Sequence, residues 1–276
     1  MPGTLYVVPT PIGNLSDITV RAKEVLASVH FVAAEDTRVS GRLLTLLDIQ
    51  KPLVSYHEHN KSRSGQAILD RLLVGESCAL VTDAGTPAIS DPGEELVALC
   101  RKNNVEVIAL PGACAAVTAL SGSGMPSRRF SFEGFLPQGG KERAEYLNSI
   151  RRDTRTMIFH ISPHDSSADI SDLISALGDR RAVLAKELTK INERYFVSTL
   201  SALRDGFDDG SINRKGEFVL IVGGYIPTDE DSFWADMSVK QHYEHYVNLG
   251  MPRMDAIKAV ASDRGVPKND IYRELN

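Results

Sequence analysis

The first 120 residues alternate short apolar runs with amphipathic segments, and this alternation restricts the fold more than any other feature. The apolar runs are strand-sized and nearly continuous, as in strands buried on both faces of a sheet. The segments between them carry hydrophobic residues at helical spacing. Such βα units predict a parallel sheet covered by helices on both faces. The predicted strands are TLYVV from Thr4, HFVAAED from His30, LVSYH from Leu53, CALVTD from Cys78 and VEVIAL from Val105.

A second block is predicted after the Gly/Ser/Pro-rich stretch at residues 121–129, which resembles a linker. Strand and helix patterns alternate less regularly there, so we expect a mixed sheet. The last part of the chain, from Ser238, predicts short helices interrupted at 250–252 and 265–267. The chain is therefore predicted to be α/β, with domains at residues 1–121 and 122–228 and a small helical segment at residues 229–276. The other predicted helices span residues 17–28, 39–47, 66–74, 141–151, 167–177 and 200–207, with one more starting near Pro92.

The composition is that of a globular protein. A length of 276 residues is enough for one large or two smaller domains, and no apolar run reaches the length of a membrane span. The N-terminus lacks the basic and apolar regions of a signal peptide, so a cytoplasmic location is predicted. The cysteines are interpreted as small buried hydrophobes rather than ligands or disulfides. They are Cys78, Cys100 and Cys114.

The formal net charge of −5 is not that of a simple nucleic-acid coat protein. Positive charge is nevertheless concentrated in the middle of the chain, between Arg128 and Arg155. Solvated helix faces are the usual explanation of such a run. A surface that binds a phosphate backbone is the alternative, and we expect it in this stretch if the protein binds nucleic acid.

The stretch TDAGTPAISDPG, from Thr82, holds more turn-forming residues than a simple connection needs. Its end predicts a helix start, with Asp91 as the N-cap and Pro92 at the first helical position. The residues before Asp91 are not needed for capping. Asp83 follows a strand at the carboxyl edge, where open α/β sheets bind ligands, and Gly85 permits backbone conformations that other residues avoid.

Two more strands end in turns rich in proline and glycine, within VVPTPIGN and ALPGAC. Close packing of a helix on the sheet is the alternative explanation of the small residues after the second of these turns. Three such turns at one sheet edge predict a shallow cofactor site built largely from backbone groups. No GxGxxG follows the first strand and no GxxxxGKS/T occurs, so neither of these nucleotide sites is expected.

The histidines do not predict a metal site. His57 and His59 are placed on one face of a strand, without an evident third ligand. His242 and His245 have helical spacing and are interpreted as surface residues.

Seven stretches in a fixed order cover nearly the whole chain. They are GTLYVVPTPIGNLSDIT from Gly3, AAEDTR from Ala33, YHEHN from Tyr56, TDAGTPAISDPG from Thr82, LPGACAAVTAL from Leu110, FEGFLP from Phe132 and KGEFVLIV from Lys215. On these motifs the chain closely resembles the bacterial ribosomal RNA small subunit methyltransferase I group, within the tetrapyrrole-methylase-like class of enzymes that depend on S-adenosylmethionine (SAM). The resemblance implies two α/β domains of the class III methyltransferase type with the cofactor in the cleft between them, a small C-terminal helical segment, and usually a homodimer.

The resemblance also implies a reaction, which is methyl transfer from SAM to the ribose 2′-hydroxyl of a cytidine in the decoding centre of 16S rRNA, with the small ribosomal subunit as the substrate. The cofactor residues that it implies are Pro11, Asp83, Ala84, Gly85, Thr86, Pro87, Pro111, Gly112, Ala113, Phe135 and Leu136. A ribose hydroxyl attacks poorly while it keeps its proton, so a carboxylate or imidazole within hydrogen-bond reach is expected to help. The residues expected to act in catalysis are Glu35, Asp36, Arg38 and Glu58, with no metal. A helix cap formed by Asp36 or Thr37 is the alternative for AEDTR.

One motif departs from the group. After the TMIF strand the group usually has an aromatic residue, a Glu and then Ser-Pro-His-Arg, whereas this chain reads HISPHD from His160. The Glu and the last Arg are missing, so Ile161 and Asp165 are left out of the expected site.

Two other functions remain open. A methylase of a small molecule such as a tetrapyrrole uses the same fold, but those relatives usually carry a Gly-Pro-Gly-Asp-like first loop where this chain has PTPIGN. The second alternative is a non-catalytic ribosome-binding protein that kept the fold. The altered HISPHD stretch is the reason to consider it.

Overall fold

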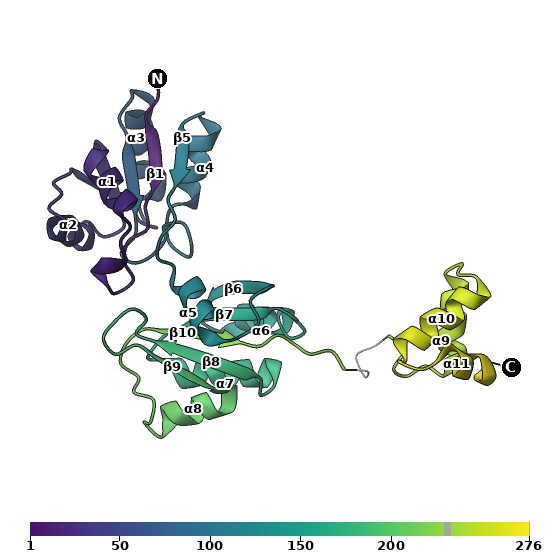
Figure 1. Cartoon of the computed structure of the whole chain (residues 1–276). Coiled ribbons are helices and arrows are strands. Elements are labelled where there is room, and N and C mark those ends of the chain that lie inside the picture. Colours follow the sequence, from purple (N-terminus) through teal and green to yellow (C-terminus); the bar gives the residue numbers. More distant parts are fainter. Residues whose placement is uncertain (229–232, 276) are drawn as a thin grey trace. The chain divides into compact units, whose positions relative to one another are not determined.

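The protein is described by a computed structural model that covers residues 1–228 and 233–275 (Figure 1). Residues 1–224 form one compact unit and residues 225–276 a second. Residues 229–232 and 276, which belong to the predicted C-terminal segment, lie outside the described residues. The predicted boundary between residues 121 and 122 falls inside the first unit and stays a prediction.

The first sheet of the larger unit is parallel, as predicted. Its strands follow the order β3-β2-β4-β1-β5, and all neighbours pair in parallel. The strands buried in its centre are apolar on both faces because helices cover both sides. The five strands of the sheet are β1 (Thr4–Val7), β2 (Phe31–Ala34), β3 (Leu53–Ser55), β4 (Cys78–Val81) and β5 (Glu106–Ala109).

Two helices pack on each face of this sheet (Figure 1). Leu26 and Leu44 come from one pair of helices and pack with Val32 and Val81. Leu72 and Leu96 come from the other pair and pack on the opposite face. The pairs are α1 (Val20–Ser28) with α2 (Thr37–Leu46), and α3 (Lys61–Leu73) with α4 (Glu94–Lys102), and the short 3-10 helix η1 (Leu15–Asp17) precedes α1.

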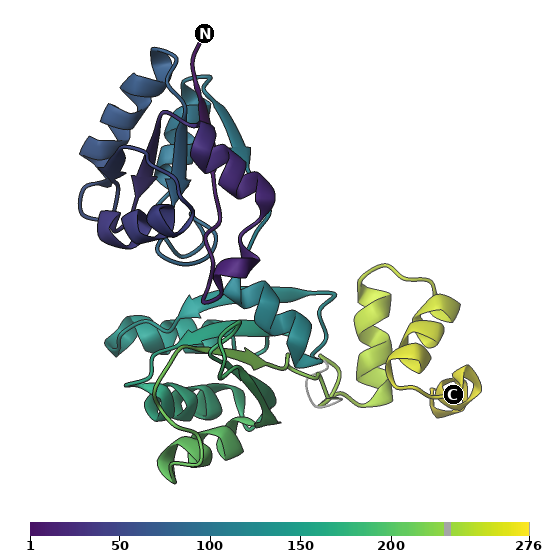
Figure 2. The ribbon, with the colours of Figure 1, turned by 60° about the vertical axis from the view of Figure 1, so that its left-hand side comes forward.

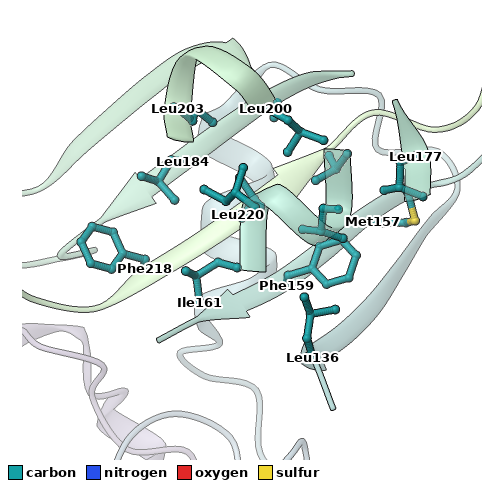
Figure 3. Packing of buried hydrophobic residues seen from close by; sticks show 14 of the residues in the cluster. Leu136, Met157, Phe159, Ile161, Leu177, Leu184, Leu200, Leu203, Phe218 and Leu220 are labelled. Carbon is teal, nitrogen blue, oxygen red and sulfur yellow. The ribbon is translucent and has the colours of Figure 1, made fainter. Parts of the chain in front are cut away.

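The second sheet is mixed, as predicted, with the order β6-β7-β10-β8-β9. The pair β6 and β7 is parallel and the remaining pairs are antiparallel. Its strands are β6 (Phe130–Phe135), β7 (Thr156–Ile161), β8 (Arg181–Lys186), β9 (Arg194–Thr199) and β10 (Phe218–Val222). One face packs on the helices α6 (Gly140–Ser149), α7 (Ser166–Leu177) and α8 (Leu200–Asp208), and Figure 3 shows the core between them.

The other face of the second sheet is covered by α5 (Ala115–Ser123), the helix of small residues (Figure 2). A Cβ placed on Gly122 would lie 2.4 Å from the hydroxyl oxygen of Tyr195, so the small side chains permit close packing. Ile12, from the turn after β1, is buried in the same cluster. The turns of the first sheet are therefore packed against the second sheet.

The smaller unit contains α9 (Val239–Asn248), α10 (Arg253–Asp263) and α11 (Lys268–Glu274), where the sequence predicts helices. The surface position predicted for His242 is wrong, because its side chain is fully buried. His242 Nε2 lies 3.1 Å from an Asp263 carboxylate oxygen, and Arg264 donates to Nδ1 at 3.2 Å. Both ring nitrogens thus have hydrogen-bond partners, which offsets the cost of burying this imidazole.

No helix in the described residues has both the length and the apolar character that a bilayer span requires. Cys78 and Cys100 are buried, as predicted, and Cys114 is half-buried.

Candidate functional site

The turns that follow β1, β4 and β5 meet at the carboxyl edge of the first sheet. The Thr10 N–H donates to the Gly85 carbonyl at 2.8 Å, and the Gly85 N–H donates back to the Thr10 carbonyl at 3.1 Å. The Thr86 hydroxyl donates to the Ala113 carbonyl at 2.8 Å. The predicted convergence of the three turns is confirmed.

Gly112 allows the turn after β5 to lie directly on the turn after β1. A Cβ placed on Gly112 would lie 2.4 Å from the Cβ of Pro9, well inside any real contact between such atoms. A side chain at this position would therefore push the two turns apart.

A cavity of about 430 Å³ opens beside these turns. Its volume lies within the range of roughly 300–1,000 Å³ that is usual for small-molecule sites. The turns of the first sheet and the helix start that follows them form one side, and the strand ends of the second sheet form the other. The first side consists of Ile12 and residues 84–86, 89–91 and 114–116, and the second of Phe132, Phe135, Leu188 and residues 160–163 and 216–219.

Three rings form an aromatic wall of the cavity: Phe132, Phe135 and His160. The His160 ring centroid lies 5.2 Å from each phenyl centroid, edge-on to Phe132 and tilted by 36° to Phe135. Burial lowers the pKa of His160, although the charge of Glu217 opposes this, so the imidazole is neutral at neutral pH. Phe135 is 62% exposed. A neutral wall with one exposed ring is a surface on which a planar base stacks well.

Glu35 is held in place by Thr82, which is buried. The Thr82 hydroxyl donates to a Glu35 carboxylate oxygen at 2.7 Å. The Thr82 carbonyl in turn accepts from the Thr10 hydroxyl at 3.1 Å. The carboxylate after β2 is thereby tied to the turns after β4 and β1.

Asp36 caps α2 and is paired with Arg38. Its carboxylate accepts from the Arg38 backbone N–H at 2.8 Å and from the guanidinium at 2.6 Å. These bonds from Arg38 hold the pKa of Asp36 at about 2. The helix-cap alternative is confirmed for Asp36, and a carboxylate with so low a pKa is a weak proton acceptor. Neither residue lines the cavity.

Asp83 joins the ends of β2 and β4. Its carboxylate accepts from the Asp36 backbone N–H at 3.1 Å. Burial raises the pKa of Asp83, the hydrogen bond from Asp36 opposes the rise, and the charge of Glu35 adds to it. This carboxylate organises the two turns rather than facing the cavity.

The predicted role of Asp91 as the N-cap of α4 is wrong. The helix begins at Glu94, and Gly93 occupies the cap position without a side-chain bond. Gly93 has a φ of 152°, and a Cβ on it would lie 3.0 Å from the Cβ of Ala88. Because the backbone turns there in a conformation that suits glycine, the helix starts after Gly93 and leaves Asp91 outside it.

Asp91 instead lines the cavity, and prediction from the sequence missed it as a site residue. Burial raises the pKa of Asp91 to about 6, the charges of Glu35 and Asp83 add to the rise, and the nearby Thr82 side chain opposes it. The signal in the sequence was the presence of acids after neighbouring strands, since parallel strands bring their carboxyl ends to one edge.

The motif YHEHN contributes nothing to the cavity. Strand β3 ends at Ser55, so His57 and His59 lie in a turn and their predicted place on a strand is wrong. Glu58 is exposed and pairs with Lys61 at 2.6 Å. In the described part of the chain, no cluster of three His, Cys, Asp or Glu side chains is placed to bind a metal ion.

The residues predicted at the cofactor divide into three sets. Those that line the cavity are Ala84, Gly85, Thr86 and Phe135. Those that lie in the converging turns without lining it are Pro11, Asp83, Pro87, Pro111, Gly112 and Ala113. Leu136 is buried in the core of the second sheet together with Phe159 (Figure 3), because successive residues of an extended chain point in opposite directions.

The contribution of the second sheet to the cavity was also largely missed. Leu188, His160 and Glu217 line it, and none of them was predicted at the site. Glu217 belongs to the motif KGEFVLIV and His160 begins HISPHD, so the motifs contained these residues without showing where they point.

The basic stretch between Arg128 and Arg155 is partly neutralised. Arg143 pairs with Asp169 and Asp172, each at 2.7 Å. Arg155 pairs with Asp153. The phosphate-binding role of this stretch stays a prediction.

Comparison with known proteins identifies similar chains. Residues 4–204 match the family described as Tetrapyrrole (Corrin/Porphyrin) Methylases. The chain is 47% identical to the Ribosomal RNA small subunit methyltransferase I of Halalkalibacterium halodurans over 98% of this chain and 93% of that protein. It is 43% identical to the protein of the same name from Bacillus subtilis, with the same coverage.

A solved structure shares the fold. It is the uroporphyrin-III C-methyl transferase from Thermus thermophilus complexed with S-adenyl homocysteine. Its TM-score to this chain is 0.57 at 18% identity, over 80% of this chain and 97% of that one.

Proposed function

The chain belongs to the ribosomal RNA small subunit methyltransferase I family of tetrapyrrole methylases, and we propose that it methylates the ribose 2′-hydroxyl of a cytidine in the decoding centre of 16S rRNA, with SAM as the donor. The names of the full-length relatives support methylation of small-subunit rRNA. The cytidine, the 2′-hydroxyl and the decoding centre rest on the resemblance of the motifs. The small ribosomal subunit as substrate, the homodimer and the cytoplasmic location also remain predictions.

The observation that carries the proposal is the cavity between the converging turns and the aromatic wall. Its residues fit SAM. The turn at residues 84–86 offers backbone groups to the polar amino-acid part, and Phe135 offers a ring face to the adenine. The carboxylates Glu35 and Asp83 place negative charge at this edge, which favours a cationic ligand.

SAM, when bound, supplies a methyl group that is already activated as an electrophile. The work left to the protein is positioning, which supplies a large share of the rate in such reactions. The Thr10–Gly85 bridge and the Thr86–Ala113 bond hold the three turns rigidly together. The apolar side chain of Ile12 on the side of the turns, and those of Leu188 and Val219 on the side of the second sheet, exclude water from the cavity.

The charge of the protein is consistent with a folded RNA target. With a net charge of −5, the protein attracts bulk RNA weakly. Recognition of shape and of an accessible nucleotide then has to contribute to selectivity. A ribosomal subunit offers such a shape, and free duplex RNA does not.

The test is methyl incorporation from labelled SAM into purified small ribosomal subunits that lack the modification. We expect label in 16S rRNA at a cytidine whose 2′-hydroxyl is blocked to alkaline cleavage. Label at a base atom would contradict the proposed position. A parallel assay offers uroporphyrinogen as the methyl acceptor, and label there but not in rRNA would establish the small-molecule alternative. Binding of subunits without methyl transfer would establish the non-catalytic alternative.

A further inference from the structure

We propose that the Asp91 carboxylate accepts the proton of the substrate hydroxyl, and this inference rests on the proposed methyl transfer to ribose. Asp91 is a carboxylate that lines the cavity at the edge where the turns converge. Of the acids expected from the sequence, Glu35 accepts a hydrogen bond from Thr82 and does not line the cavity. Asp36 is tied to the N-terminus of α2 and to Arg38. Glu58 lies outside the cavity.

The charges around Asp91 leave it available as a base. Its acidic neighbours are Glu35 and Asp83, at the ends of β2 and β4. No ion pair joins Asp91 to a lysine or arginine in the residues that the structure describes. Glu217, the other cavity carboxylate, is paired with Lys190 at 3.1 Å. Across the cavity stands the neutral ring of His160, which is the rival base.

The backbone around Asp91 is held in conformations that non-glycine residues avoid. Ala88 has a φ of 65° and Ser90 a φ of 59°, and Gly93 follows at 152°. Strain of this kind persists only where the surrounding structure enforces it, and it is concentrated at functional sites. With the backbone in these conformations, residues 89–91 form part of the cavity wall and do not form the first turn of α4.

The pKa of about 6 suits the role. At pH 7.5 the group is largely ionised, and it is far more basic than an exposed carboxylate. In the step, the ribose O–H bond breaks and its proton moves to an Asp91 oxygen. The ribose oxygen forms the new bond to the methyl carbon, and the electron pair of the broken carbon–sulfur bond stays on sulfur. The proton leaves to solvent once the product has dissociated.

The experiment compares Asp91→Asn, His160→Asn and Asp36→Asn with the control Glu94→Gln. Glu94 is an exposed acid in the first turn of α4, so its variant removes a nearby charge without touching the cavity. Each protein is assayed for single-turnover methyl transfer on small subunits, for SAM affinity by calorimetry and for its thermal midpoint. We expect Asp91→Asn to lose about 100-fold or more in rate, the usual contribution of a general base, with SAM affinity within about threefold. Glu94→Gln should stay within about threefold of wild type, as for an ordinary surface substitution.

The pH dependence gives a second readout. The wild-type rate should rise with pH through about 6 and then level off, because the base must be ionised, and Asp91→Asn should lose this limb. Carbon-13 NMR of aspartate-labelled protein, assigned by difference from Asp91→Asn, should show the Asp91 carboxyl titrating near pH 6. This measurement needs no activity and applies even if the variant is unstable.

Several results would overturn the proposal. An active Asp91→Asn, or a pH limb that vanishes in His160→Asn or Asp36→Asn instead, would assign the proton to another group. An Asp91 carboxyl that titrates at its ordinary value, about 4, would remove the physical basis. If wild-type protein binds SAM but methylates no rRNA, the proposed function itself fails and this step fails with it. If the wild-type protein and Asp91→Asn both methylate rRNA, the proposed function stands and only the role of Asp91 as the base is rejected.

Discussion

The turn after β2 and the loop after β4 have a similar arrangement, but the pKa values of their aspartates are shifted in opposite directions. Each leaves a parallel strand at the same sheet edge, and each carries an aspartate just before a helix. In the first, Asp36 reaches the helix N-terminus and an arginine, and its pKa falls to about 2. In the second, Gly93 separates Asp91 from the helix, and burial raises the pKa to about 6. In this pair, the backbone dihedral after the aspartate decides whether the side chain caps the helix or lines the cavity.

The largest expected effect comes from the glycine that separates Asp91 from α4. Gly93→Ala places a Cβ 3.0 Å from Ala88 and Leu80 atoms at a φ that side chains rarely adopt. We expect the loop to rearrange, the thermal midpoint to fall and the methyl-transfer rate to drop by about 100-fold, since small displacements of a reacting group cost this much.

The matched control lies in the helix after β2. Gly41 is in α2, and a Cβ on it would meet only Leu53 Cδ1, at 3.4 Å. Gly41→Ala should stabilise the protein, by up to about 1 kcal/mol from helix propensity, and leave the rate unchanged. Equal losses of activity in the two variants would mean that the loop after β4 has no special role.

A medium effect is expected from the aromatic wall that faces this loop. Phe135→Ala removes an exposed ring from the cavity, and a stacked ring is worth roughly 1–3 kcal/mol, so we expect SAM Kd or the KM for small subunits to rise by about tenfold. The thermal midpoint should change little because Phe135 is 62% exposed. Calorimetry and initial rates measure the two constants.

Phe130→Ala is the control for the ring. Phe130 lies on the same strand and is 41% exposed, but it does not line the cavity. If Phe135→Ala and Phe130→Ala have the same effect, the aromatic wall binds neither cofactor nor substrate. The cavity beside the loop after β4 would then not be the binding site.

The smallest effect is on stability, and its sign differs between the two aspartates. The folded pKa of Asp91, about 6, lies above an unfolded value of about 4. The folded state therefore binds more protons between these values, and the free energy of unfolding falls as pH rises from about 4 to 6. Asp91→Asn removes this dependence and should raise the thermal midpoint at pH 7.5 relative to wild type.

Asp36 should behave in the opposite way. Its folded pKa of about 2 lies below the unfolded value, so its stabilisation is present above about pH 4 and is lost as pH falls toward 2. Asp36→Asn should therefore lower the thermal midpoint by a constant amount between pH 4.5 and 7.5, whereas the gap for Asp91→Asn should grow with pH over the same range. Midpoints at three pH values measure both, and parallel curves for the two variants would contradict the contrast.

Much of the fold was predictable because periodic patterns report local structure directly. The parallel first sheet, the mixed second sheet and the C-terminal helices all occur where the patterns indicate them. The errors lie at ends of elements. The strand LVSYH stops at Ser55, and α4 starts at Glu94 rather than near Pro92. At the start of α4, the backbone dihedral of Gly93 outweighs the propensity of the neighbouring residues.

The candidate site was predictable only on the side formed by the first sheet. Turns rich in Pro and Gly marked that edge, and Ala84, Gly85 and Thr86 do line the cavity. His160, at the end of β7, and Leu188, in the turn after β8, were missed because they are far away in the sequence from the turns of the first sheet. No local pattern shows which face of a mixed sheet will meet those turns. The same limit explains Leu136, whose neighbour Phe135 faces the cavity while Leu136 faces the core.

The sequence by itself determined the order of the strands and helices, the parallel first sheet and the edge at which its turns emerge, because hydrophobic period and turn chemistry are local properties. Only the tertiary structure decided which carboxylate keeps its negative charge and which one holds a proton more tightly. The proton affinity of an aspartate depends on its burial and on the charges within a few ångströms of it. For Asp36 and Asp91, those surroundings exist only once the strands, the loops and Gly93 have taken their places.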